Sequence, residues 1–252
     1  MIRRAVAVTN SERIKLTTLR SPLWASAAAA VLSVGLATLQ ASVAYDHERL
    51  TVPTAALGVA VFGVPVLMIV AAMTLTGEYR NGLIATTFMA TPARTLVICA
   101  KAVVAAVYSA AAAALMVVGS VLVARLVAAP GVGDNLTVAA TLGFAAAIAP
   151  YAGLAAVLGV GVAALLRHTA GAVTVLLLWP LLVEPLLANM PGRRWEVGPY
   201  LPFANAFRFL DVQWLFPGFA WRWGALGSLG YFAAVITVVF AAALVVVNRR
   251  DA

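Results

Sequence analysis

Long apolar stretches and short polar ones alternate along the whole chain. Counted between charged residues, six apolar runs are long enough to cross a bilayer as helices. They lie at about 22–45, 53–76, 97–127, 138–166, 169–189 and 223–248. These runs are too long and too continuously apolar for the strands of a membrane β-barrel. The pattern therefore predicts an all-α, polytopic membrane protein with six transmembrane helices.

The composition agrees with this pattern. The 252 residues are 63% hydrophobic and only 10% charged, whereas soluble domains average about 25% charged residues. The longest polar or mixed stretch has about 30 residues, which is too short for a separate soluble domain. We therefore expect a single transmembrane domain over residues 1–252.

The basic residues indicate an orientation. With the N-terminus placed inside, the inner loops carry the entire net charge of +8, and the outer loops are balanced. Basic residues favour the cytoplasmic side of a membrane. We therefore expect a multi-pass protein of the plasma (inner) membrane with both termini in the cytoplasm. The same distribution explains the positive charge without nucleic acid as a partner.

The residues before the first span predict a short helix at 9–21. Thr9 and Glu12 match a capping box, which places the helix start near Asn10, and Pro22 breaks the chain before the membrane. Leu16, Leu19 and Leu23 fall on one side at helical spacing. The charged members of the segment are Glu12, Arg13, Lys15 and Arg20. Two interpretations remain: a basic topology anchor, or an elbow helix lying along the inner leaflet with snorkelling basic side chains.

Residues 78–94 form the longest polar interruption in the first half of the chain. A helix can begin at Glu78, after Gly77, where a carboxylate suits the positive end of the helix dipole. Thr91 precedes Pro92, which disfavours helix at Thr91 and closes the element. Its apolar side chains, Leu83, Phe88 and Met89, could enter the groove of a soluble partner. The alternative is an ordinary interfacial loop.

Residues 190–222, together with Trp223, are rich in aromatic residues, glycine and proline. Trp and Tyr favour membrane interfaces, so two short re-entrant or interfacial helices fit this loop. It either anchors the protein at the interface or forms an outer gate with Trp195, Phe203 and Phe207.

Glu184 lies inside the fifth span, where a carboxylate is costly unless it is paired or hydrated. One interpretation is a substrate- or proton-handling group of the transport pathway. The other is a structural carboxylate that is satisfied by the backbone of a broken helix or by Arg193.

Several motifs are absent from the sequence. It contains neither the P-loop pattern G-x-x-x-x-G-K-[ST] nor the zinc pattern H-E-x-x-H. His47, His168 and Cys99 have no neighbouring ligands in the sequence. We therefore expect no catalytic, cofactor-binding or metal-binding residues, and do not expect an enzyme.

Three stretches resemble a known family: SERIKLTTLRSPLW, GEYRNGLIATTFMATPARTLVICAK, and the region LLLWPLLVEPLLANMPGRRW followed by PYLPFANAF. In order and topology they are similar to permease subunits of ABC-2 type transporters, especially actinobacterial ones, over essentially the whole chain. The resemblance implies that the N-terminal segment is a connecting helix and that 78–94 is a coupling helix for a separate ATP-binding subunit. The implied coupling residues are Glu78, Tyr79, Arg80, Gly82, Leu83, Phe88 and Arg94.

The resemblance implies a permease that pairs with itself or with a homologous permease and with two ATP-binding subunits. ATP and Mg²⁺ would bind those subunits. The expected function is export of a hydrophobic or amphipathic substrate, of the drug or lipid class, by alternating access. The alternative is an energy-independent secondary transporter or a membrane scaffold. Inverted repeats would favour a secondary transporter, but the sequence shows no convincing internal repeat.

Overall fold

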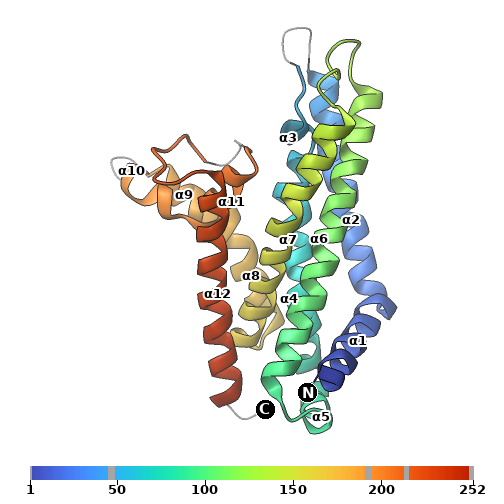
Figure 1. Cartoon of the computed structure of the whole chain (residues 1–252), viewed down its shortest axis with the longest axis vertical. Coiled ribbons are helices and arrows are strands. Elements are labelled where there is room, and N and C mark those ends of the chain that lie inside the picture. Colours follow the sequence, from blue (N-terminus) through green and yellow to red (C-terminus); the bar gives the residue numbers. More distant parts are fainter. Residues whose placement is uncertain (1, 45–48, 191–193, 213–215, 250–252) are drawn as a thin grey trace.

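The computed structural model describes residues 2–44, 49–190, 194–212 and 216–249, without the side chains of residues 2, 194 and 195. Within these ranges the regular structure is entirely helical, and six helices are long and apolar enough to cross a membrane. Figure 1 shows them arranged as an elongated bundle. The prediction of an all-α fold with six helices long and apolar enough to cross a membrane is confirmed, and these helices fit a multi-pass membrane protein.

The six spans have the following bounds. They are α2 (Arg20–Val43), α4 (Val64–Arg80) with the preceding π-helical turn η1 (Val59–Gly63), α6 (Arg94–Val127), α7 (Val138–Leu166), the broken helix α8–η2–α9 (Thr169–Leu178, Trp179–Val183 and Glu184–Ala188), and α12 (Ala225–Arg249). A four-residue helix, α3 (Val52–Ala55), precedes the second span. The fourth span, α7, has the bounds that the apolar run predicts.

Helices α4 and α7 lie at the centre of the bundle. Most of their residues are buried, whereas only 22% of the apolar window is buried in each of α2, α8–α9 and α12. The two central helices approach closely at Gly159, because a Cβ there would overlap the carbonyl oxygen of Met68. The exposed apolar surface of the outer helices suits contact with lipid or with another membrane subunit.

The N-terminal prediction needs correction. Helix α1 runs from Ile2 to Thr18, so Thr9 lies inside it and the predicted capping box is absent. Leu19 is extended, and α2 begins at Arg20. The break precedes Pro22 because the proline ring would clash with the carbonyl group four residues earlier in a continuous helix.

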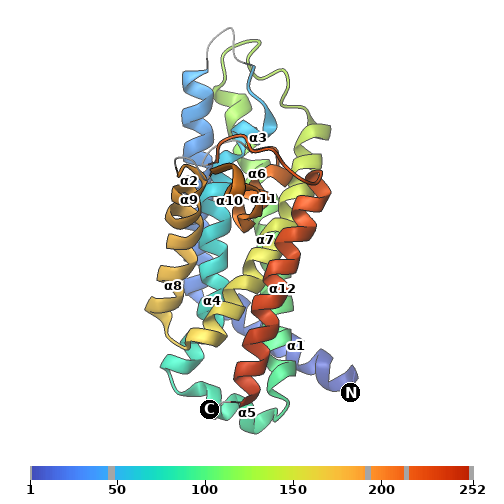
Figure 2. The same cartoon turned by 90° about the vertical axis from the view of Figure 1, so that its left-hand side faces the viewer.

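The predicted leucine stripe is also wrong. Leu16 is buried in the bundle, whereas Leu19 and Leu23 are exposed. The extended residue between α1 and α2 changes the direction of the chain, so residues on either side do not share one helical face. Figure 2 shows α1 leaving the bundle sideways at the end where α5 lies, which we call the foot.

The second correction concerns residues 78–94. Helix α4 continues through Gly77 and Glu78 to Arg80, and the chain then turns at Gly82, which has a φ of +69°. This left-handed conformation is easily adopted by glycine and commonly ends helices. Glu78 therefore lies in the last turn of α4 rather than at the start of a new helix.

The rest of this segment forms helix α5 (Leu83–Ala90). Thr91 is extended before Pro92, as predicted, and α6 begins at Arg94. We call residues 81–93 the α4–α6 turn; it forms the foot of the molecule (Figure 1).

Between α9 and α12 the structure describes α10 (Arg194–Val197), the 3₁₀ turn η3 (Gly198–Tyr200) and α11 (Pro202–Phe209). In Figure 1 these elements gather with α9 beside the upper end of α12, well below the upper ends of α2 and α6. Short helices are therefore present where the aromatic-rich loop predicts them.

Candidate functional site

Four charged side chains from three helices meet near the foot. Glu12 and Lys15 come from α1, Glu78 comes from α4, and Lys101 comes from α6. The Nζ atom of Lys101 lies 2.6 Å from Glu12 Oε2 and 2.7 Å from Glu78 Oε1. The Nζ atom of Lys15 lies 2.8 Å from an oxygen of each carboxylate. These four residues form the charge network, whose formal charges cancel.

Burial makes this network interdependent. The side chain of Lys101 is only 1% exposed and those of Glu12 and Glu78 are almost as deeply buried, whereas that of Lys15 is 42% exposed. The ammonium group of Lys101 also donates to the carbonyl oxygen of Thr74 at 3.3 Å, so all three of its hydrogens have an acceptor. Removing one partner of such a buried pair typically costs about 3–5 kcal/mol.

The position of Glu78 in α4 reverses the expected effect of the helix dipole on its carboxylate. The C-terminal end of α4 carries a partial negative charge, which disfavours Glu78 there by about 0.3–1 kcal/mol. The dipole therefore opposes the carboxylate, contrary to the sequence prediction, and the two lysines hold it in place.

The titration of Lys15 reflects the same contacts. Burial lowers the pKa of Lys15, but its hydrogen bonds to Glu12 and Glu78 and their negative charges raise it, and the net pKa lies above its ordinary value. Lys15 is therefore fully charged at neutral pH.

The α4–α6 turn presents a mixed surface. Arg80, Leu83 and Met89 are exposed, with Met89 74% exposed. Phe88 is buried, and the guanidinium carbon of Arg94 lies 5.3 Å from the centre of its ring. Leu83 and Met89 are therefore accessible, whereas Phe88 is covered in this structure and its contact with a partner stays a prediction.

The turn is also tied to the helices on its other side. Arg94 Nη1 donates to the carbonyl oxygen of Val247 at 3.4 Å, and Asn248 Nδ2 donates to Thr95 Oγ1 at 2.9 Å. These contacts join the start of α6 to the end of α12.

Near the foot, Tyr79 of α4 contacts the residue that follows α7. The guanidinium carbon of Arg167, the residue that follows α7, lies 5.3 Å from the centre of the Tyr79 ring. With the charge network and the α12 contacts, the segment from Glu78 to Thr95 is fixed to α1, α6, α7 and α12. A force applied to the turn would therefore reach most of the bundle.

Glu184 occupies a different environment at the upper end of the broken span. It is fully buried, and its Oε2 atom accepts hydrogen bonds from the backbone N–H groups of Phe203 at 2.8 Å and Ala204 at 3.2 Å. Its Oε1 atom accepts from Trp179 Nε1 at 2.9 Å. Phe203 and Ala204 lie in the first turn of α11, so Glu184 caps that helix from another element.

Glu184 is therefore satisfied largely by backbone groups, but these belong to α11 and not to the broken helix that the sequence analysis expected. Arg193, the other partner considered, lies outside the described residues. A role for Glu184 in substrate or proton handling stays a prediction, because the contacts explain its burial without testing transport.

The predicted gate aromatics are part of the core in this structure. Phe203 and Phe207 are both buried. Phe203 packs edge-on against Phe232 of α12, and Phe207 packs edge-on against Tyr151 of α7. The side chain of Trp195 lies outside the part of the chain that the structure describes. Phe203 and Phe207 therefore join α11 to α7 and α12, and their role as a gate stays a prediction.

Sequence analysis did not assign Lys101 to a site. The sequence did indicate that Lys101 needs a partner. It lies at the edge of a long apolar run, where an ionisable side chain is costly unless it is paired. Its partners Glu12 and Glu78 lie 89 and 23 residues earlier in the sequence. The pattern alone does not identify partners at such distances.

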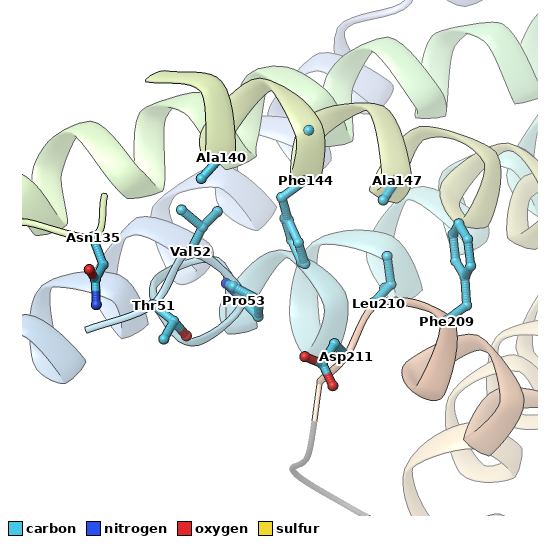
Figure 3. Close-up of a pocket in the computed structure, with 11 residues that line it drawn as sticks. Thr51, Val52, Pro53, Asn135, Ala140, Phe144, Ala147, Phe209, Leu210 and Asp211 are labelled. Atoms are coloured by element: carbon cyan, nitrogen blue, oxygen red, sulfur yellow. The ribbon is translucent and has the colours of Figure 1, made fainter. Parts of the chain in front are cut away.

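The structure also contains an open groove at the end opposite the foot, with a volume of about 470 Å³. Figure 3 shows Phe144 and Ala147 of α7, Pro53 of α3 and Leu210 along its apolar wall, and Asp211 at its rim. No sequence signal predicts it.

The comparisons with known proteins add no assignment. The chain matches no protein-family model and no curated protein sequence. The likeness to ABC-2 permeases therefore rests on the sequence segments themselves.

Proposed function

We propose that this chain is the membrane-spanning permease subunit of an ATP-driven exporter of the ABC-2 type. The observation that carries the proposal is the α4–α6 turn, which exposes Leu83 and Met89 and is joined to α1 and α6 through the charge network. A separate subunit that binds ATP and Mg²⁺ docks on this turn, since the chain has no P-loop.

In the proposed mechanism, the ATP-binding subunit holds α5 in a groove on its surface, as grooves hold amphipathic helices in other complexes. Closure of two such subunits on ATP moves the turn. Because buried charges resist separation from their partners, α1, α4 and α6 move together. The bundle then changes between two packings that open to opposite sides of the membrane.

The exported substrate is hydrophobic or amphipathic, of the drug or lipid class. On this proposal, α1 is the elbow helix along the inner leaflet, and α10 and α11 are re-entrant elements of an outer gate. Glu184 would hold the gate closed through Phe203 and Ala204, and Trp195 and Phe207 would shape the exit.

The assembled exporter contains two ATP-binding subunits and a second permease, which is either another copy of this chain or a homologous one. The foot faces the cytoplasm of a plasma-membrane protein, because the excess of basic residues lies there. A membrane-impermeant thiol label tests this orientation. It should react in intact cells with Thr51→Cys and not with Ser11→Cys, and the opposite result would reverse the orientation.

Co-purification tests the proposed function. The wild-type chain, isolated in mild detergent, should carry a protein that photo-affinity ATP analogues label. Leu83→Glu/Met89→Glu should lose at least about 90% of it, because a charge in an apolar groove is costly.

The control for this experiment is Leu126→Glu at the other end of α6. Leu126 is as exposed as Met89. The Leu126→Glu variant should retain the ATP-binding partner. The proposal fails if no ATP-binding protein is recovered with the wild-type chain, or if both variants retain it equally.

A further inference from the structure

The exposed charged side chains of α1 and of the first turn of α2 are all basic, and so is the partly exposed Lys15 of the charge network. Arg3, Arg4 and Arg13 of α1 and Arg20 of α2 are exposed. The only acidic residue between positions 1 and 24 is Glu12, and its carboxylate is buried against Lys101. Among the described residues of α1 and of the first turn of α2, no exposed acidic side chain neutralises these arginines.

An open hollow with an apolar wall adjoins one of these arginines, Arg20. Arg20, Leu23, Trp24 and Ala27 line a space of about 430 Å³ at the start of α2. The side chain of Trp24 is 75% exposed, and Leu23 is also exposed. A guanidinium group thus stands next to an indole ring and an aliphatic side chain on one helix face.

The position of this hollow fixes its depth in a membrane. Arg20 is the first residue of a spanning helix, so its guanidinium lies where the apolar run begins, at the level of the headgroups. Trp24 is about 6 Å further along the helix axis, at the interfacial depth that tryptophan favours. The charge and the aromatic ring therefore match the order of a lipid molecule, headgroup first and acyl chain next.

We propose that the exposed arginines of α1 and the Arg20–Trp24 hollow bind anionic lipids of the leaflet at the foot. The lipid class is a phosphodiester with net negative charge, such as phosphatidylglycerol. Arg13 and Arg20 attract the phosphate, and Leu23 and Trp24 contact the first part of an acyl chain. Each basic residue near an anionic membrane surface strengthens binding by about fivefold.

This binding would act on the charge network through a single helix. The outward face of α1 meets the lipid, while Glu12 and Lys15 of the same helix contact Lys101 and Glu78. Anionic lipid would hold α1 in the position that keeps these pairs closed. This inference does not depend on the identity of the partner at the α4–α6 turn.

Quenching of Trp24 by brominated lipids tests the proposal with the full-length chain in phosphatidylcholine nanodiscs. The part of the quenching that Trp24→Phe removes reports on this site. Brominated phosphatidylglycerol should quench it at a far lower mole fraction than brominated phosphatidylcholine. Arg13→Gln/Arg20→Gln should raise the phosphatidylglycerol fraction needed for half-maximal quenching by about 10-fold or more, since two basic residues are lost.

Two matched variants complete the test. Arg49→Gln/Arg125→Gln removes two exposed arginines at the opposite end and should behave like the wild type. Arg13→Lys/Arg20→Lys keeps the charges and should retain most of the preference. The proposal is overturned if phosphatidylglycerol and phosphatidylcholine quench equally, or if both Gln pairs shift the response equally. It is also overturned if millimolar inorganic phosphate abolishes the preference, because that would indicate a site for soluble anions.

Discussion

The two buried carboxylate sites of this molecule are stabilised in opposite ways. At the foot, Glu78 lies against two lysines that come from other helices. At the upper end, the donors to Glu184 within the described residues are all neutral, and two of them are backbone N–H groups of α11. One site thus depends on charge pairs between distant segments, and the other depends on the dipoles of a nearby helix end.

This difference implies different mechanical behaviour. Separating α1, α4 or α6 at the foot would leave a buried charge without its partner, so these helices are expected to move as one body. Separating Glu184 from α11 breaks hydrogen bonds that water could replace near the membrane surface. The comparison therefore favours a rigid foot that transmits force and an upper end that can open.

The largest expected effect is that of Lys101→Met. The change leaves two buried carboxylates with only the partly exposed ammonium group of Lys15, and it should lower the free energy of unfolding by about 3–5 kcal/mol. Denaturant unfolding in mixed micelles measures this loss. Addition of Glu78→Gln should recover much of it, because Glu12 then pairs with Lys15 alone. A loss below about 1 kcal/mol for the single variant would show that the network does not stabilise the foot.

Glu184→Ala should have the next largest effect. It removes the acceptor for three donors, each costing about 1–3 kcal/mol when buried without a partner, so we expect a loss of about 3 kcal/mol. Glu184→Gln keeps a carbonyl oxygen and should cost about 1 kcal/mol. The sharper comparison is with Glu78→Gln. This change removes a negative charge beside the buried ammonium group of Lys101, so it should lower the free energy of unfolding more than Glu184→Gln does. If Gln is tolerated better at position 78 than at position 184 in the same unfolding assay, the contrast between the two sites is wrong.

Lys15→Met should have the smallest effect, about 0–1 kcal/mol, because the amine is partly exposed to water. A lysine whose pKa is raised in the folded state stabilises the protein below its unfolded pKa, and loses this contribution as the pH rises through the folded pKa. The difference in unfolding free energy between wild type and Lys15→Met should therefore stay constant from pH 6 to pH 9. It should decline only above the ordinary lysine value of 10.5. A decline near neutral pH would contradict the assigned pairing.

The spans were predictable because hydrophobicity summed over about 20 residues is a local property of the sequence. Helix ends were harder to place. The chain has two candidate glycine breaks near the foot, and α4 continues through Gly77 and stops at Gly82, where the chain takes a positive φ. The pair Asn81–Gly82 carried that signal, since both residues are common at helix ends.

The pairing of buried charges could not be predicted in the same way. The sequence pattern predicted Glu12 to be a capping residue of a local helix, yet its carboxylate contacts Lys101 on α6. Glu184 caps α11, which begins well after it in the sequence. Such contacts depend on how helices pack in three dimensions, and one sequence contains no local pattern that reports them.

Photo-crosslinking in living cells tests the central claim most directly, because it locates the partner on the molecule. A photoreactive amino acid is placed at Met89 of the α4–α6 turn, and at the equally exposed Leu126 as the control. The account predicts a covalent adduct with an ATP-binding protein from position 89 and none from position 126. An adduct with that protein from position 126 alone, or none from either position in cells that contain the assembled complex, would contradict the α4–α6 turn as the docking site.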